Sequence, residues 1–485
     1  MPDDCSPVLA WMRGSLRVQD NPLLAQAAQA GGDVVPFLCM SDGWSGTGDT
    51  PGRRMLRASI TALDELLRSG GSALFMLGDD PLREIPRAAS SLGAKKLFVT
   101  RSADAFLRRS DSRLARALSD IGCAICEIDD RALFGGDVVR TSSGSHYSVF
   151  THYRNAWLSR IQEALPPAPP VISTLARMPS LRRCETLEGY RPSAGGGEPL
   201  ALSMLDEFTR TGIDVYHLKR DTPGADGTSR LSPHLASGAI SVRTVLSAVR
   251  RESTAPAARG SGGAAAFIGE LIWREFFRHV MEHCPRVAEE PYREEFSAFP
   301  WRRGEKAFAS WCQGTTGYPI VDAGMRQLSA EGWMHNRVRM IVASFLTKDM
   351  HIDPRRGEAL FFERLADADR ASNNGNWQWV AGTGTDAAPY FRIFNPVLQG
   401  KKFDPLGTYV RAYVPEIARV PDAYIHAPWE MSPALQKECS FRPGKDYPRP
   451  IVNHAEEREH ALRMFRAARA GRAAGRKSTP ASVRE

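Results

Sequence analysis

The strongest constraint on the fold is the alternation of apolar runs and amphipathic segments in residues 1–130. Five runs have the length and composition of buried strands: Val8–Met12, Val34–Met40, Ser72–Leu77, Lys96–Thr100 and Cys123–Ile128. Four segments between them have helical periodicity: Pro22–Ala30 (capped by Asn21), Pro51–Arg68, Pro81–Leu92 and Ala103–Ile121. This alternation predicts a doubly wound five-stranded parallel sheet. Neither a G-x-G-x-x-G nor a Walker A motif accompanies it, so the predicted fold assigns no function.

The rest of the chain has a different character. Residues 131–200 contain Pro166, Pro167, Pro169, Pro170 and Gly195–Gly197, a composition that favours an irregular connection. From residue 201 onward the pattern is mostly helical, and Arg463 to Lys477 reads as a solvated basic helix face. We therefore expect an α/β domain over 1–130, a linker over 131–200 and a helical domain over 201–485.

Composition narrows the partners and the compartment. A net charge of +8 and a pI of about 9.1 suit a polyanion such as DNA. No run of apolar residues is long enough to cross a membrane, and Met1 to Pro7 lacks the features of a secretion signal, so a cytoplasmic location is expected. The eight scattered cysteines do not form a disulfide framework, and Cys123 and Cys126 read as structural thiols.

Two segments of the helical part suit a bound ligand. Gly227–His234 places hydroxyl groups and an arginine before a helix that Pro233 would open, and such a helix N-terminus can cradle a phosphate. A plain N-cap would explain Ser232 equally well. In Glu270–Phe277, a helix would bring to one face a carboxylate, two aromatic rings and a guanidinium, namely Glu270, Trp273, Arg274 and Phe277.

Two further segments strengthen this interpretation. In Gly332–Met340, Asn336 and Met340 share a helix face. Asp367–Trp379 contains two acids, an asparagine cluster and two tryptophans. Asparagine is unfavourable inside helices, so a polar ligand explains this cluster better than packing does.

These four segments, with 311–326, 382–402 and Trp11–Arg17, resemble the photolyase/cryptochrome family. The resemblance covers nearly the whole chain, is strongest from 215 to 405, and is closest to the class I cyclobutane pyrimidine dimer photolyases. It implies FAD in the helical domain, an antenna-binding α/β domain, UV-damaged DNA as the partner, and a monomer. The implied activity is light-driven repair of the dimers by electron transfer from excited reduced FAD.

The resemblance also assigns a flavin site. Asn373 aligns with the residue that faces flavin N5, where an amide cannot supply a proton as a carboxylic acid can. Arg339 is expected to pair with Asp367. The full set of implied FAD-binding residues is Tyr216, Thr228, Ser229, Arg230, Leu231, Ser232, Arg339, Asp367, Asp369 and Asn373.

A lesion pocket follows in the same way, because photolyases flip their target bases out of the duplex. Trp273 and Trp379 match the tryptophans that flank the dimer, and Met340 matches the methionine beneath it. Glu270 and Asn336 match the residues that hydrogen-bond the dimer. The implied DNA-binding residues are Arg220, Arg274, Phe277, Arg337, Gln399 and Lys401.

The chain departs from the family in its electron path. Relatives carry three tryptophans from the flavin to the surface; Trp377 and Trp301 match the inner and outer ones. The middle position is Pro354, which cannot carry an electron hop. We expect slow photoreduction, or a detour through Tyr390 or Phe361.

A second departure concerns the antenna. Phe106 and Leu107 stand where folate-binding relatives have an Asn-Glu pair, so a folate antenna is not expected. A deazaflavin, a second flavin or no antenna remain open.

Four alternative functions compete with dimer repair. A cryptochrome-type blue-light receptor is disfavoured by Asn373, Trp273, Met340 and Trp379 together. A (6-4) photolyase is disfavoured because Asn336 and Met340 stand where that type carries histidines. A general flavin oxidoreductase does not need the aromatic lesion pocket, and a DNA-binding protein without chemistry does not need the asparagine-rich segment.

Overall fold

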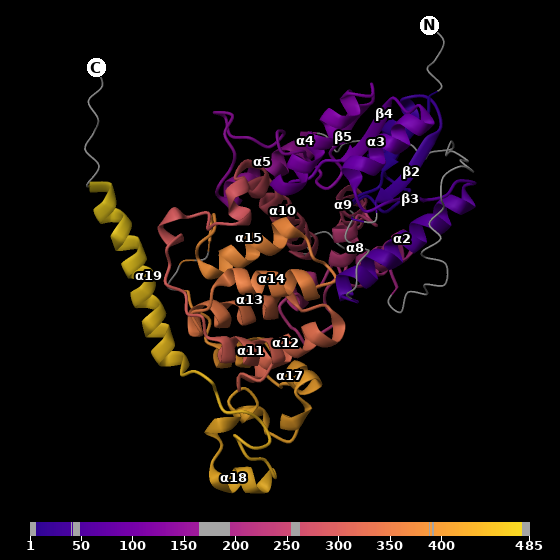
Figure 1. Ribbon diagram of the computed structural model, residues 1–485. Helices are drawn as coiled ribbons and strands as arrows, with labels where there is room; N and C mark the ends of the chain where they lie inside the picture. The colour runs from indigo at the N-terminus through magenta and orange to yellow at the C-terminus, as the bar shows by residue number, and fades with distance from the viewer. Residues whose placement is uncertain are drawn as a thin grey trace. The chain divides into compact units, whose positions relative to one another are not determined.

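The computed structural model describes residues 6–39, 41, 49–163, 195–253, 262–387, 389 and 392–477 (Figure 1). Three predictions concern residues outside these ranges, namely Met40, the prolines at 166–170 and Tyr390. The chain packs into two compact units. Unit 1 comprises 1–218, 228–285 and 366–371, and unit 2 comprises 219–227, 286–365 and 372–485.

The sheet of unit 1 has the predicted architecture. Its strands are β1 (Val8–Trp11), β2 (Val34–Cys39), β3 (Phe75–Leu77), β4 (Lys96–Thr100) and β5 (Ala124–Ile128). All pairs are parallel, in the order β3-β2-β1-β4-β5. Val8 of the central strand stands opposite Val34 on one side and Lys96 on the other. The third strand is shorter than the predicted Ser72–Leu77.

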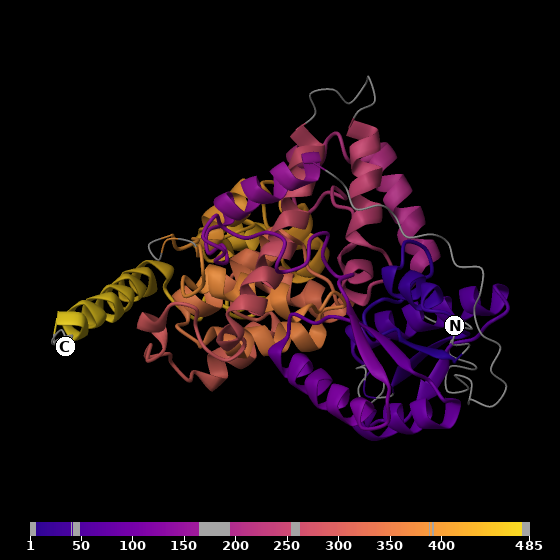
Figure 2. The ribbon, with the colours of Figure 1, turned by 90° about the horizontal axis from the view of Figure 1, so that it is seen from above.

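Helices cover both faces of this sheet, as the prediction of a doubly wound fold requires (Figure 2). On one face, α1 (Pro22–Gln29) and α2 (Pro51–Ser69) contribute Leu23 and Leu63 to a core with Val34. On the other, α3 (Pro81–Leu92) and α4 (Ala105–Ser119) contribute Ile85 and Leu114 to a core with Leu97. Asn21 caps α1 as predicted, because its side chain accepts a hydrogen bond from the N–H of Leu24.

The segment expected to be an irregular linker contains a helix, so that part of the prediction is wrong. Helix α5 spans Phe150–Glu163. Its buried residues Phe150, Tyr153, Trp157 and Ile161 recur every three or four positions, which is the period of an amphipathic helix. The proline-rich composition of the following residues concealed this period. The next helices along the chain are α6 (Glu198–Thr211), α7 (Tyr216–Lys219), α8 (Ser232–Ser237), α9 (Val242–Ser253) and α10 (Gly262–His283).

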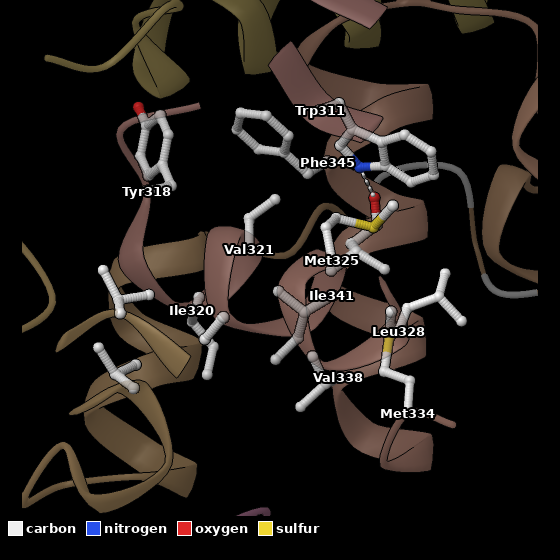
Figure 3. Packing of buried hydrophobic residues seen from close by; sticks show 14 of the residues in the cluster. Trp311, Tyr318, Ile320, Val321, Met325, Leu328, Met334, Val338, Ile341 and Phe345 are labelled. Atoms are coloured by element: carbon white, nitrogen blue, oxygen red, sulfur yellow. Dashed lines mark hydrogen bonds between the residues drawn. The ribbon is translucent and has the colours of Figure 1, made fainter. Parts of the chain in front are cut away.

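Unit 2 is helical, and its helices pack around one large apolar core. Its members include Trp311, Val338 and Phe345 (Figure 3). The helices of unit 2, including α15, which begins in unit 1, are α11 (Glu305–Gln313), α12 (Pro319–Glu331), α13 (Asn336–Ser344), the π-helix η4 (Phe345–Asp349), α14 (Pro354–Arg364), α15 (Arg370–Ala381), α16 (Pro396–Phe403), α17 (Thr408–Tyr413), α18 (Pro433–Glu438) and α19 (His454–Lys477). Among the described helices, none is long and apolar enough to span a bilayer.

Candidate functional site

The segment before α8 carries the predicted phosphate-binding residues. Thr228 and Ser229 are half-buried, and the Ser229 hydroxyl accepts a hydrogen bond from the N–H of Leu231 at 3.4 Å. Leu231 is the N-cap of α8 and makes no side-chain capping bond. Ser232 is the first helical residue, so the plain N-cap explanation of Ser232 is wrong. Its hydroxyl is exposed at the helix start, where anions are favoured.

Helix α10 presents the second predicted group of residues, and Trp273 is fixed by stacking. The rings of Trp273 and Phe150 lie face to face, with centroids 3.5 Å apart and an interplanar angle of 5°. Phe277 packs against the same indole at 5.4 Å. Glu270 lies one turn earlier and is half-buried. Because both rings come from unit 1, the orientation of the Trp273 indole is set within that unit.

Arg274 has backbone partners inside unit 1. Its guanidinium donates to the carbonyl oxygen of Arg131 at 2.7 Å and to that of Leu235 at 3.4 Å. Burial lowers the pKa of Arg274 from its usual value. Arg274 thus ties α10 to α8, and its predicted contact with DNA stays a prediction.

A cluster of arginines surrounds Asp369. The Asp369 carboxylate lies 3.5 Å from Arg131 and 3.7 Å from Arg278. Burial, together with the neighbouring guanidinium groups of Arg278 and Arg274, lowers the pKa of Arg131 to about 9. Asp369 thus lies among the guanidinium groups of Arg131, Arg278 and Arg274, and the carboxylates of Asp130 and Glu275 also act on this cluster.

Helix α13 of unit 2 carries the third predicted group. It begins at Asn336, whose side chain is exposed, and His335 caps it by accepting the N–H of Arg337 at 3.2 Å. The Arg337 guanidinium donates to Asp221 at 2.7 Å and lies over the ring of Phe403 at 4.5 Å. Arg339 donates to the carbonyl oxygen of Met334 at 2.7 Å. Met340 is half-buried against the apolar core.

Helix α15 carries the asparagine cluster, and the structure divides its roles. Asn373 is half-buried and donates to the carbonyl oxygen of Glu358 at 2.8 Å. Asn374 is buried and donates to the carbonyl oxygen of Val287 and to the Glu358 carboxylate. Asn374 therefore serves the fold, since buried amides need protein partners.

The two tryptophans of α15 differ in burial. Trp377 is almost completely buried, whereas Trp379 is half-buried at the edge of the same core. Gly357 of α14 permits this packing, because a Cβ there would lie 2.1 Å from the Trp377 ring. Trp301, the other predicted electron carrier, is half-buried beside Phe299.

The remaining predicted residues are placed as follows. Tyr216 is buried against Phe208 and Phe267 in unit 1, and Asp367 is half-buried. In unit 2, Arg220 and Gln399 are half-buried and Lys401 is exposed on α16.

Each unit thus holds one part of the predicted site. Unit 1 holds Tyr216, Thr228, Ser229, Arg230, Leu231, Ser232, Glu270, Trp273, Arg274, Phe277, Asp367 and Asp369; unit 2 holds Arg220, Trp301, Asn336, Arg337, Arg339, Met340, Asn373, Trp377, Trp379, Gln399 and Lys401. Their assembly into one site, including the pairing of Arg339 with Asp367, stays a prediction.

The sequence did not identify three residues beside the predicted ones. Phe150 was hidden in the presumed linker, and Arg131 stood just after a strand without a motif. Arg278 follows Arg274 by four positions, so the helical period could have placed it on the same face.

Two family models match the chain. The sequence model described as the FAD binding domain of DNA photolyase matches residues 267–467, and the one described as DNA photolyase matches residues 8–171. A curated relative, the deoxyribodipyrimidine photo-lyase of Agrobacterium fabrum, is 39% identical over an alignment of 475 positions that covers 95% of this chain and 98% of that protein.

Two solved structures are similar over almost their whole length. A bacterial class III photolyase from Agrobacterium tumefaciens has a TM-score of 0.87 and 38% identity, covering 96% of this chain and 98% of the other. A cryptochrome from Synechocystis has a TM-score of 0.85 and 31% identity, covering 94% of this chain and 99% of the other.

Proposed function

The chain belongs to the DNA photolyase family, and on this basis we propose that it repairs cyclobutane pyrimidine dimers in UV-damaged DNA with blue light. The observation that carries the proposal is the 39% identity to a deoxyribodipyrimidine photo-lyase over nearly the full length of both proteins. The match to the family's FAD domain also includes the candidate residues that lie on α10, α13 and α15.

The donor set of unit 1 fits FAD. Thr228, Ser229 and Ser232 offer hydroxyl groups at the start of α8 for phosphate or ribityl oxygens. The guanidinium groups around Asp369 add the positive charge that a dinucleotide requires. Reduced FAD, when bound, supplies the electron that opens the dimer after light absorption.

The residues of the chain would bind and orient the dimer and the flavin. Stacking on Phe150 holds the Trp273 indole in one orientation, so its flat face can support a flipped pyrimidine ring. Met340 and Trp379 would complete the apolar walls, while Glu270 and Asn336 would hydrogen-bond the polar edges of the dimer. Asn373, held by the carbonyl oxygen of Glu358, would present its amide toward flavin N5.

The DNA track would follow Arg220, Arg274, Phe277, Arg337, Gln399 and Lys401. Basic side chains position the duplex through its phosphates, whereas the dimer itself is recognised in the pocket. We further propose that the protein works as a monomer in the cytoplasm and that an antenna, if bound, is not folate.

The test is light-dependent repair of a thymine-dimer oligonucleotide by the purified, chemically reduced protein. We expect dimer loss under blue light and none in the dark. Glu270→Ala is expected to lower repair, while Trp429→Phe, a change elsewhere in the core, serves as the matched control.

A cryptochrome-type receptor is the second candidate, because the Synechocystis cryptochrome has nearly the same fold. Persistence of the dimer in illuminated, reduced and FAD-loaded protein would favour this candidate. An oligonucleotide with a (6-4) lesion, illuminated in parallel, tests the remaining alternative, a (6-4) photolyase.

A further inference from the structure

The structure interrupts the electron path expected from Trp377. Pro354 is the first residue of α14 and is buried. Its saturated ring has no π system that could hold a radical, so an electron hop cannot stop there. An electron path that begins at Trp377 must therefore turn to another ring.

Two rings lie against Trp377 within unit 2. Phe361 of α14 is nearer, with ring centroids 5.1 Å apart and an interplanar angle of 80°. Trp311 of α11 lies 6.3 Å away at 72°. Both are edge-to-face contacts of the kind that aromatic rings favour. A benzene ring is much harder to oxidise than an indole, so Trp311 is the suitable donor of the two.

The packing holds Trp311 firmly in this position. Its indole is fully buried, and its N–H donates to the carbonyl oxygen of Val342 at 3.1 Å (Figure 3). Phe361 stacks on its face at 6.2 Å and 12°. Gly357, one turn before Phe361 on α14, lets the Trp377 ring approach the backbone of that helix. The distance between the two indoles is thus set by close packing.

Trp301 belongs to a different cluster. It packs with Phe296, Phe299 and Phe465, and its ring contacts are with Phe299 at 4.3 Å and Phe465 at 6.5 Å. Trp377 and Trp311 instead belong to the large core. A middle tryptophan would link the two clusters, but Pro354 occupies that position in this chain.

We propose that Trp311, rather than Trp301, is the electron donor that follows Trp377 when oxidised FAD is photoreduced; this rests on the proposed role of Trp377. Trp377 would give one electron to the bound flavin after light absorption. One electron then passes from Trp311 to the oxidised Trp377, whose indole becomes closed-shell again. Trp311 becomes the indole radical cation, and one electron from an external thiol reductant later restores it.

The surroundings of Trp311 determine the fate of this radical. Its N–H faces a carbonyl oxygen, which hydrogen-bonds but does not remove a proton, so the radical stays a protonated cation. A buried cation is poorly solvated, and Trp311 is fully buried. The electron therefore tends to return, and net photoreduction is slow without added thiol.

Transient absorption of the oxidised holoprotein after a light pulse tests the proposal. Trp311→Phe is expected to abolish the longer-lived indole-radical signal, leaving rapid recombination from Trp377. Trp301→Phe and the core control Trp429→Phe are expected to retain that signal. In the wild type, the signal should have the spectrum of the protonated cation.

Survival of the signal in Trp311→Phe, or its loss in Trp301→Phe, overturns the proposal. A deprotonated neutral-radical spectrum in the wild type overturns it too. The last two results do not depend on whether Trp311→Phe folds, which circular dichroism and FAD content report. Dimer repair by chemically reduced wild-type protein is a separate measurement, so failure of the proposed function and failure of this inference are distinguishable.

Discussion

Strands β1 and β2 of unit 1 and helix α15 of unit 2 are both largely buried, but different interactions hold them in place. All residues of β1 and β2 are buried, and both cores that flank the sheet consist of apolar side chains. Helix α15 buries apolar side chains such as Trp377, but it also buries Asn374 and Gln378, and both amides are hydrogen-bonded.

This difference predicts how each region tolerates amino-acid substitutions. An apolar core requires volume and shape, so residues of similar size can replace each other. A buried amide requires particular partners, because an unsatisfied group pays its full desolvation cost. The predictions below test this contrast, beginning with the largest expected effect.

Leu97→Ala should be the most destabilising change. Leu97 is fully buried in β4, and its truncation should lower the free energy of unfolding by about 2–5 kcal/mol through lost burial and a cavity. Leu97→Met, which keeps the volume, should cost less than about 1.5 kcal/mol. Urea unfolding followed by circular dichroism measures both. Equal losses in the two variants would show that volume does not govern the sheet.

Asn374→Ala should cost about 1–3 kcal/mol, because it removes the amide that donates to the Glu358 carboxylate and to the Val287 carbonyl and that accepts from Gln378. Gln378→Ala should cost a similar amount, since Gln378 donates to Val287 and accepts from the N–H of Tyr292.

The matched control for these two variants is Asn376→Ala on the same helix. Asn376 is exposed and bonds only locally, to the carbonyl oxygen of Ser372, among the described residues. Its substitution should change stability by no more than about 0.5 kcal/mol. If the three asparagine and glutamine variants unfold alike, buried hydrogen bonds do not distinguish α15.

A pH titration of stability extends the contrast to a buried polar group of unit 1. His279 is buried and accepts the N–H of Tyr147 at 3.0 Å. Burial, assisted by His283 and His146, lowers its pKa from 6.5 to about 3. Below pH 6.5 the unfolded chain binds a proton that the folded chain resists, so stability should fall on acidification, by about 1 kcal/mol per pH unit.

His279→Gln keeps an acceptor for Tyr147 and removes this titration. The variant should therefore lose less stability than the wild type between pH 6.5 and pH 5, as measured by urea midpoints. Identical pH profiles would assign the acid sensitivity to other groups.

The smallest effect is expected at Phe106, which lies in α4 at a position where folate-binding relatives have one residue of their Asn-Glu pair. Its side chain is 68% exposed. Phe106→Ser should change stability by no more than about 0.5 kcal/mol, since surface changes of this kind rarely do more. Repair driven by direct excitation of FAD should not change either, and a large loss of repair would place Phe106 at a functional contact.

The sequence predicted regular elements better than side-chain partners. The apolar periods located all five strands, and Asn21 located the start of α1. Helix α5 was missed because prolines nearby outweighed its buried Tyr153 and Trp157. The partners of Asn374, namely Val287 and Glu358, could not be foreseen, because hydrogen bonds between distant residues leave no period in the sequence.

By itself, then, the sequence determined the parallel sheet, the helical FAD domain and the family, because these depend on local periodicity and on contiguous motifs. Only the tertiary structure decided which groups meet. It stacked Phe150 on Trp273, gathered Arg131 and Arg278 around Asp369, and placed Trp311 beside Trp377. Such contacts join residues far apart in the chain, and close packing fixes them only once the whole core has formed.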